Sequence, residues 1–431
     1  MPTYNEIPPN ASFFGEALRK YGYDFSSALA DIIDNSITAQ ATCIEIQFLP
    51  SKDWLFIQDN GLGMSKSDLE SAMVLGSGDP LATRDPKDLG RFGCGLKTAS
   101  FSQARKLTVL SKKNNTISGA QWDLDHIRKS NGWKLGILSS KEVTDYFDKY
   151  ELSIKSKSGT IVFWENIDQM KGIGNERAAD QNAKIDSAKE HLRLTFHRFI
   201  SKNLLIVVNG DELKPLDPFL KGKSVEHPLQ KVPIEENSKE YIELQGYTLP
   251  ALNKLSQTQQ DEVRLNDDLN QAQGFYIYRG NRLIKYGGWL GLKKYQALTN
   301  LSRVRVDVPN SLDAEWNTDI KKTTMDPPPR VMLQLRKLLN RFSDPSKKIH
   351  RRRASDQVKQ VEMWQRFEKQ EIESDESEIS YKINNKAKKF ENLLNILNDD
   401  QSKKFLELIK DIECELPYQQ ISIDVIDDKL K

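Results

Sequence analysis

A glycine-rich run at residues 90–98 limits the folds open to this chain more than any other segment does. It reads Gly-Arg-Phe-Gly-Cys-Gly-Leu-Lys-Thr and leads into a segment of helical character. Glycines before a helix leave backbone N–H groups directed at an anion, which the helix dipole also attracts. A P-loop beginning at Gly90 would need a lysine at position 96, where Leu96 stands, and the third glycine of a Rossmann fingerprint is missing. The run therefore predicts an anion-binding site. It fits neither a P-loop nor a Rossmann fold.

Length and composition indicate a multidomain globular chain without a strong charge bias. The 431 residues suffice for about two or three domains. Because 63 Lys and Arg oppose 61 Asp and Glu, the net charge is +2, and a charged partner must be met by a local patch. The mean hydropathy is -0.60, no apolar run is long enough to cross a bilayer, and the start lacks the features of a signal peptide. We therefore expect a cytoplasmic protein without a membrane segment.

The cysteines and histidines do not point to metal or thiol chemistry. The three cysteines lie at positions 43, 94 and 414, too far apart for a disulfide framework, and the five histidines are equally scattered. The sequence therefore does not favour a zinc site or nucleophilic catalysis by a Cys/His pair.

Apolar spacing over residues 1–175 predicts an α/β sandwich. Between residues 12 and 38, apolar side chains recur at helical intervals around a Tyr-Gly-Tyr break, which indicates two helices. Residues 43–48 and 54–57 alternate apolar and polar side chains around a turn, the pattern of a β-hairpin. Further strands are expected at residues 106–111, 116–124, 133–138 and 159–164. Together these elements favour a mostly antiparallel sheet with helices packed on it.

A second α/β unit is expected over residues 176–342, followed by a basic linker and a mostly helical region over residues 343–431. The second unit opens with an amphipathic stretch and a strand at residues 204–208, which ends in an Asn-Gly-Asp turn. Strands near residues 274–278 and 303–308 follow, and three prolines precede a closing helix near residues 331–341. Two later helices are expected near residues 390–397 and 405–412.

Two polar residues on the second helix form the first part of a candidate site. Asp31 and Asn35 are four residues apart, so they lie on the same helix face. A carboxylate there can take a proton from water, and an amide oxygen can help hold Mg²⁺, which otherwise keeps water and phosphate oxygens as ligands. A solvent-facing polar side of an amphipathic helix would also explain this pair taken alone.

The segment after the hairpin adds a possible site for a flat ring. Asp59 stands at a strand end, where it can accept a hydrogen bond from an exocyclic amine, and Gly61 and Gly63 let the backbone pass close to a ring. Asp-Asn-Gly is also an ordinary turn. Residues 76–86 are rich in Gly, Pro and Asp and are typical of a lid that closes over a nucleotide. The hydroxyl of Thr160, at the start of a strand, can reach the edge of a base.

In this order and at these spacings, the four elements resemble the motifs of the GHKL ATPase superfamily, which includes gyrase B, the ninety-kilodalton heat-shock chaperone, histidine kinases and MutL. The pair Asp31 and Asn35 is similar to the E-x-x-x-N box of that superfamily, and residues 59–63 are similar to its adenine box. Residues 90–97 are similar to its phosphate box, and Gly159-Thr160 to its last adenine motif. The resemblance covers roughly the first 165 residues and looks strongest to the MORC and MutL branch.

The resemblance implies a site for ATP and Mg²⁺. Asp59 would bind the adenine amine beside Gly61, Gly63 and Thr160, and Asn35 would hold Mg²⁺. The residues expected around the phosphates are Gly90, Gly93, Gly95 and Lys97. Asp31 stands where the family usually has its glutamate base. Because aspartate is shorter by about 1.5 Å and a positioned base contributes about 10²- to 10⁴-fold, we expect an ATPase with slow turnover.

The resemblance also implies a role for two lysines in the second unit. In gyrase-like and MutL-like ATPases, a transducer of ribosomal-protein-like α/β fold follows the nucleotide domain and sends a lysine to the γ-phosphate. Residues 319–323, Asp-Ile-Lys-Lys-Thr, look like that switch loop. Lys322, with Lys321 beside it, is the candidate for stabilising charge on the transferring phosphoryl group. A pair of solvated surface lysines is the other interpretation.

The densest basic run follows the second unit. Such runs can neutralise phosphates and give salt-dependent DNA binding, although a solvated linker has the same composition. The DNA-binding candidates are Lys347, Lys348, Arg351, Arg352 and Arg353. MORC and MutL relatives act on DNA. Residues 400–407 resemble the endonuclease motif of some MutL proteins only faintly, since its histidine is missing, and we expect no nuclease activity.

Together these features predict an ATP-gated clamp. In this hypothesis Mg·ATP closes the lid, two copies associate as a homodimer, and hydrolysis assisted by Asp31 resets them. Similarity to standalone bacterial MORC-like proteins implies a setting in anti-phage defence or restriction, with partner proteins. The alternatives are a nucleotide-sensing interaction module with little turnover and a client-protein chaperone.

Overall fold

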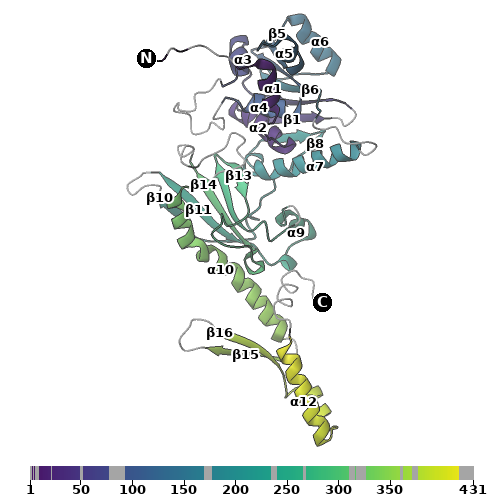
Figure 1. The fold of residues 1–431 in the computed structure, drawn as a ribbon, viewed down its shortest axis with the longest axis vertical. Helices are drawn as coiled ribbons and strands as arrows, with labels where there is room; N and C mark the ends of the chain where they lie inside the picture. Colours follow the sequence, from purple (N-terminus) through teal and green to yellow (C-terminus); the bar gives the residue numbers. More distant parts are fainter. Residues whose placement is uncertain are drawn as a thin grey trace.

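The computed structural model describes residues 2, 4, 9–20, 22–48, 52–76, 93–168, 177–233, 240–265, 268–309, 316, 327–359, 363–370 and 377–416. Three parts follow one another along the long axis of the molecule (Figure 1). The amino-terminal part holds an eight-stranded sheet, the middle part a six-stranded sheet, and the carboxyl-terminal part a two-stranded hairpin with helices.

The first sheet has the strand order β5-β4-β3-β6-β2-β1-β7-β8. All neighbours pair antiparallel except β1 and β7, so the prediction of a mostly antiparallel sheet is confirmed. Its strands are β1 (Cys43–Phe48), β2 (Trp54–Asp59), β3 (Lys106–Lys113), β4 (Thr116–Asp123), β5 (Gly136–Leu138), β6 (Gly159–Glu165), β7 (Leu205–Val208) and β8 (Asp211–Glu212).

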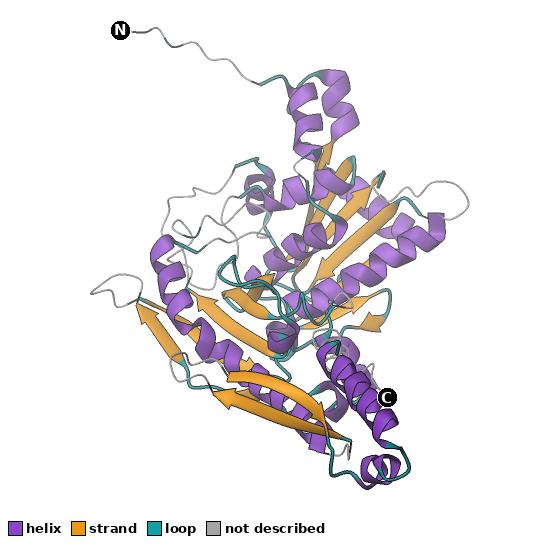
Figure 2. Cartoon of the chain, turned by 60° about the horizontal axis from the view of Figure 1, so that its bottom comes forward, coloured by secondary structure: helices purple, strands orange, loops and turns teal. Residues whose placement is uncertain are grey.

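Alternating apolar side chains give this sheet two buried faces, and helices flank it (Figure 2). Leu55 and Ile57 of β2 lie in the larger core, whereas Phe56 between them lies in the core on the opposite face, as the two-residue period of a strand requires. Helices α1 to α5 and α7 contribute to the larger core, and α6 covers the smaller one. The helices are α1 (Ala11–Arg19), α2 (Phe25–Thr38), α3 (Lys66–Met73), α4 (Gly95–Gln103), α5 (Leu124–Ser130), α6 (Ser140–Tyr150), α7 (Arg177–Thr195) and α8 (His197–Ile200).

One strand that the sequence assigned to the second unit belongs to the first sheet. β7 pairs in parallel with β1, with Cys43 opposite Leu205 and Ile46 opposite Val208. The chain reaches this place after α7, which packs on α2. The prediction that residues 204–208 form a strand of the second unit was therefore wrong, because alternation of side chains identifies a strand but not its neighbours. The first sheet extends beyond the predicted boundary at residue 175.

The middle part is an α/β unit, with the strand order β10-β11-β14-β12-β13 and β9 paired to β11. Val331, Leu335 and Phe342 of the long helix α10 pack on this sheet. Its identity as a transducer stays a prediction. Its elements are β9 (Val225–Glu226), β10 (Gln230–Pro233), β11 (Tyr241–Thr248), η2 (Leu252–Lys254), α9 (Gln257–Val263), β12 (Gly274–Arg279), β13 (Arg282–Tyr286), η3 (Ala297–Thr299), β14 (Ser302–Val308) and α10 (Pro329–Lys359).

The carboxyl-terminal part contains a hairpin that the sequence analysis missed. It consists of β15 (Trp364–Gln370) and β16 (Ser377–Ile383), which precede α11 (Lys388–Leu394) and α12 (Asp399–Cys414). The expectation of a mostly helical region did not include this hairpin, although apolar and polar residues alternate at positions 377–383, a pattern that favours a strand. No helix in the ranges given above has the length and apolar character needed to cross a membrane.

The basic run lies within α10 rather than in a linker. α10 extends to Lys359, so the run continues the helix that covers the second sheet. Lys347 pairs with Asp344 of the preceding turn at 2.8 Å. Lys348, Arg351 and Arg352 are exposed. The prediction of a basic linker was therefore wrong, although most of its cations do face solvent.

Candidate active site

Helix α2 carries the buried carboxylate of Asp31 and the exposed amide of Asn35, one turn apart. The helix begins after Asp24, whose side chain accepts the Ser27 N–H at 2.7 Å. Asp31 is only 2% exposed, whereas Asn35 is exposed. The Tyr23 hydroxyl donates a hydrogen bond to Oδ2 of Asp31 at 2.7 Å, which fixes one oxygen of the carboxylate.

The start of α4 lies directly against Asp31. A Cβ atom placed on Gly95, the first residue of α4, would lie 3.3 Å from Asp31 Oδ2. The first turn of a helix has N–H groups without intrahelical partners, and these attract anions. Gly93 has a φ of +62°, which glycine adopts readily. The structure therefore brings the predicted base and the predicted phosphate segment together. Gly90 and the predicted lid from residue 77 onward lie outside the described residues.

Asp59 is a buried acceptor at the end of β2, with an exposed fraction of 7%. Its Oδ1 accepts the Gly61 N–H at 2.8 Å, and its Oδ2 accepts the Ser36 hydroxyl at 3.0 Å. Burial raises the pKa of the Asp59 carboxyl, and these hydrogen bonds oppose that rise. Ser36 follows Asn35 on α2, so one helix contributes to both ends of the candidate site. The sequence analysis missed Ser36, which carries no motif of its own.

Strand pairing places Thr160 beside Asp59. β6 lies antiparallel to β2, and Thr160 is the register partner of Asp59. The Thr160 hydroxyl lies 2.9 Å from the Ser111 hydroxyl of the neighbouring strand β3. Two residues predicted from segments a hundred positions apart are therefore adjacent in the sheet.

The glycines after Asp59 stand where no side chain fits. A Cβ atom on Gly61 would lie 2.7 Å from the carbonyl oxygen of Ala39, at the end of α2. At Gly63, which has a φ of +62°, a Cβ atom would lie 1.9 Å from the carbonyl oxygen of Lys112. The backbone at these glycines passes close to β3 and to the end of α2. The predicted approach to a flat ring stays a prediction.

Gly63→Ala is expected to destabilise the protein more than Gly76→Ala. Both glycines have a positive φ, for which a non-glycine residue loses about 1–2 kcal/mol. Only Gly63 also meets a carbonyl oxygen, since nothing lies within 4 Å of a Cβ at Gly76. Urea unfolding of the two variants measures the difference in free energy of unfolding. Equal losses would show that the contact with Lys112 relaxes without strain.

Lys97 is buried with its ammonium group on backbone carbonyls. Its Nζ donates to the carbonyl oxygens of Gly93 at 2.6 Å and Ala72 at 2.8 Å. Burial lowers the pKa of Lys97 to about 8. In this conformation Lys97 ties the first turn of α4 to α3, and its contact with phosphates stays a prediction. Lys321 and Lys322 lie outside the described residues.

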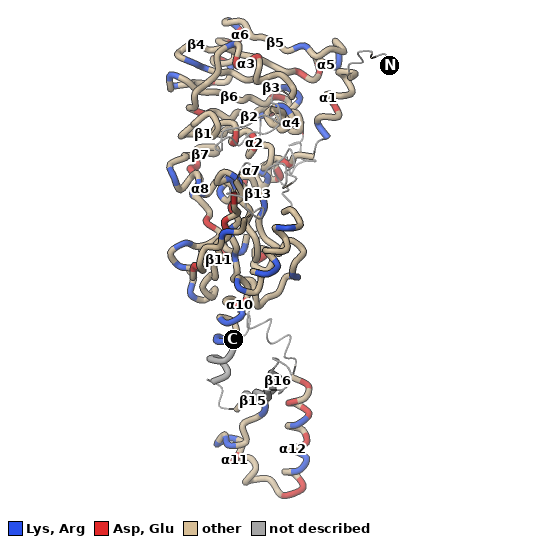
Figure 3. Tube along the Cα trace, turned by 90° about the vertical axis from the view of Figure 1, so that its left-hand side faces the viewer, with Lys and Arg blue, Asp and Glu red and all other residues tan. Residues whose placement is uncertain are grey.

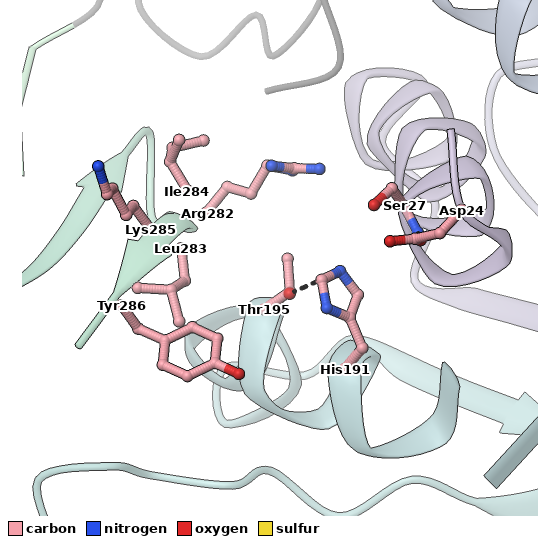
Figure 4. A pocket seen from close by; sticks show the side chains of 9 residues that line it. All are labelled: Asp24, Ser27, His191, Thr195, Arg282, Leu283, Ile284, Lys285 and Tyr286. Atoms are coloured by element: carbon pink, nitrogen blue, oxygen red, sulfur yellow. Dashed lines mark hydrogen bonds between the residues drawn. The ribbon is translucent and has the colours of Figure 1, made fainter. Parts of the chain in front are cut away.

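Arg282 is a further residue at this site that the sequence analysis missed. It begins β13 in the second sheet and is 3% exposed. Its Nε lies 2.9 Å from Oδ1 of Asp34, and its Nη2 lies 3.7 Å from Oδ1 of Asp31. A pocket of about 270 Å³ opens beside Arg282, lined by residues of α2, α7 and β13 (Figure 4). No signal in the sequence near position 282 marks this contact, because its partner Asp34 lies 248 residues away.

Comparison with known families agrees with this geometry. Residues 23–160 match the family described as histidine kinase-, DNA gyrase B-, and HSP90-like ATPase. These residues form a GHKL-type ATPase domain. The match starts at Tyr23, which contacts Asp31, and ends at Thr160, the register partner of Asp59. The GHKL domain therefore contains all the described residues that were predicted to form the site.

Several curated proteins are similar to part of the chain. ATPase morc-1 of Caenorhabditis elegans is 32% identical over 94 residues, which are 21% of this chain and 11% of the relative. ATPase MORC2B of Mus musculus is 36% identical over 98 residues, 21% of this chain and 9% of the relative. Chaperone protein HtpG of Campylobacter jejuni subsp. doylei is 35% identical over 111 residues, 23% of this chain and 17% of the relative. The chain therefore covers less than a fifth of each relative, and the similarity supports a GHKL superfamily ATPase related to MORC.

Proposed function

We propose that this protein binds and hydrolyses ATP with the help of Mg²⁺. The observation that carries the proposal is the contact between Asp31 and the start of α4. The same helix that holds Asp31 also contributes Ser36 to the buried acceptor Asp59. In this proposal, the carboxyl-terminal end of α2 supports the site of the purine amine through Ser36. The middle of α2 places Asp31 at the N-terminus of α4, where the phosphates bind.

Asp31 is the proposed base. It takes a proton from the water that attacks the γ-phosphorus, while the bond to the ADP oxygen breaks. Tyr23 keeps the carboxylate in one orientation. Because aspartate reaches less far than the usual glutamate, turnover is proposed to be slow.

Asn35 is the proposed protein ligand of Mg²⁺. Its amide oxygen is a hard donor, the kind that Mg²⁺ prefers, and its side chain is exposed one turn beyond Asp31. When bound, the ion neutralises charge on the phosphates. Gly93 and Gly95 are proposed to hold phosphate oxygens through backbone N–H groups, with Lys97, Gly90, Lys321 and Lys322 as further proposed contacts.

The wider proposal is a dimeric clamp that acts on DNA-linked processes such as anti-phage defence or restriction. Similarity to MORC ATPases supports it. Exposed cations at positions 348, 351 and 352 of α10 are proposed to contact DNA phosphates. Along the rest of the described chain, Lys and Arg are mixed with Asp and Glu (Figure 3). Such mixing favours a local contact over a general attraction to nucleic acid.

Calorimetry with Mg·ATP and Mg·GTP tests nucleotide binding, and phosphate release tests hydrolysis. We expect heat of binding for ATP and much weaker binding for GTP, because the guanine position equivalent to the adenine amine is an acceptor and would face Asp59. Sedimentation with a non-hydrolysable ATP analogue should show a heavier species, as a clamp requires. Absence of ATP binding at saturating Mg²⁺ would refute the proposal, whereas an unchanged monomer would refute only the clamp.

A nucleotide-sensing module is the second candidate. The observation that favours it is the short, deeply buried Asp31 in the place of a glutamate. Binding of ATP without measurable phosphate release would support this candidate over the ATPase.

A further inference from the structure

Two carboxylates on α2 are buried where the two sheets meet. Asp31 is 2% exposed and Asp34 is 1% exposed, and their spacing of three residues places them on neighbouring parts of one helix face. A buried carboxylate is strongly unfavourable unless a cation or hydrogen-bond donors compensate its charge. The positions of the Asp31 and Asp34 carboxylates therefore depend on the cations and hydrogen-bond donors packed against them.

Arg282 of the second sheet supplies a positive charge that compensates these carboxylates. Its Nε is at hydrogen-bond distance from Asp34, 2.9 Å, while its Nη2 stands at an ion-pair distance from Asp31, 3.7 Å. Figure 4 shows the side chain extending from β13 toward α2. A planar guanidinium can serve two carboxylates at once, which a lysine cannot do with the same geometry.

Asp31 is consequently held from two different parts of the protein. Its Oδ2 accepts the hydroxyl of Tyr23, which belongs to the GHKL domain. Its Oδ1 faces Arg282, which belongs to the second sheet. Any shift of β13 away from α2 would remove one of these two constraints and loosen the orientation of the carboxylate.

The pocket beside Arg282 gives this contact room to change. It has a volume of about 270 Å³, and Ser27, His191 and Thr195 line it together with Arg282. Burial, together with the nearby charge of Arg282, lowers the pKa of His191 to about 4. The imidazole is therefore neutral at physiological pH, and it adds no cation that would replace Arg282 next to Asp31. The pocket therefore leaves open space beside the guanidinium.

We propose that Arg282 is a positioning residue for the hydrolytic carboxylate, so that ATP hydrolysis requires β13 to be seated against α2. The inference rests on the proposed ATPase function. Arg282 acts through Asp31 and makes no contact with the nucleotide. The second sheet thereby controls turnover rather than nucleotide affinity.

The test compares Arg282→Gln and Arg282→Lys with the wild type in kcat, KM and affinity for a non-hydrolysable ATP analogue. Arg282→Gln is expected to lower kcat by about 10- to 100-fold, the range for a misplaced catalytic group. The affinity for the analogue should stay near the wild-type value. Arg282→Lys, which keeps the charge, should recover part of kcat. A purely structural role would not give this separation between turnover and affinity.

Arg198→Gln is the matched control. Arg198 of α8 is also largely buried and pairs with Asp307 of β14, so it joins a helix of the amino-terminal part to the second sheet through a different carboxylate. Its loss should lower the melting temperature but leave kcat of the folded protein near the wild-type value. If both arginine variants lose turnover equally, the effect belongs to docking of the sheets in general and the inference is wrong.

The remaining outcomes separate this inference from the proposed function. A wild-type protein that hydrolyses ATP, together with an Arg282→Gln variant of equal or higher kcat, overturns the positioning role alone. A wild-type protein that does not bind ATP overturns the proposed function and this inference with it. If Arg282→Gln does not fold, the double variant Arg282→Gln/Asp34→Asn removes the uncompensated carboxylate. Its kcat is compared with that of Asp34→Asn, and a tenfold or greater loss supports the role whereas equality overturns it.

Discussion

Asp31→Asn is expected to reduce ATP turnover by about 10²- to 10⁴-fold, the usual contribution of a positioned general base. An amide has nearly the shape of a carboxylate but cannot take up a proton from the attacking water. Its oxygen can still accept the Tyr23 hydroxyl, so the local structure should persist. Phosphate release at saturating ATP measures the loss. Calorimetry with a non-hydrolysable analogue should show that the nucleotide still binds.

The control for this prediction is Asp24→Asn on the same helix. Asp24 caps α2 by accepting the Ser27 N–H, and asparagine caps helices as well as aspartate does. The variant removes one negative charge near the pocket without changing the proposed base, so turnover should stay close to normal. Near-normal turnover of Asp31→Asn itself would remove Asp31 from the proposed mechanism.

Asp59→Asn is expected to weaken ATP binding by about 100-fold, which corresponds to about 3 kcal/mol. The carboxylate accepts from Gly61 through one oxygen and from Ser36 through the other. The amide that replaces it must place an NH₂ group at one of these positions. It can keep its oxygen on the Gly61 N–H and turn the NH₂ group toward the Ser36 hydroxyl. The adenine amine then meets a donor where it needs an acceptor.

Loss of binding by Asp59→Asn should occur without loss of folding stability. Burial raises the pKa of Asp59 above its unfolded value of 3.8. The folded protein therefore binds this proton more tightly than the unfolded chain, and stability falls as the pH rises through the interval between the two pKa values. The ionised carboxylate carries this penalty, and a neutral amide removes it. Thermal melting at pH 7 checks this, and ATP affinity equal to that of the wild type would contradict the adenine assignment.

Most local elements of the GHKL domain could be predicted from the sequence because their signals are short-range. The spacing of apolar residues around the Tyr-Gly-Tyr break marks α1 and α2, and alternation marks β1 and β2. Asp31, Asn35 and Asp59 could be selected because motif spacing places them at a helix face and a strand end. In the structure, the packing of α2 on α4 brings Asp31 to Gly95, and the pairing of β2 with β6 brings Asp59 to Thr160.

The contacts between distant segments could not be predicted in the same way. Arg282 contacts Asp34, which lies 248 residues earlier in the chain. Ser36, the residue after Asn35 on α2, donates a hydrogen bond to Asp59 but belongs to no motif. Lys97 shows a related limit, because its place in a glycine-rich motif suggested a contact with phosphates, whereas its Nζ donates to two backbone carbonyls in the structure. Residue order fixes which groups are near in sequence, but tertiary packing decides which way each side chain turns.

The parallel pairing of β1 with β7 determines where a truncated fragment of this protein can end. A fragment that stops at residue 175 would lack β7 and leave the N–H and C=O groups of β1 exposed along an open edge. Such edges readily join with other chains and promote aggregation. A fragment that runs past Glu212, the last residue of β8, keeps that edge closed.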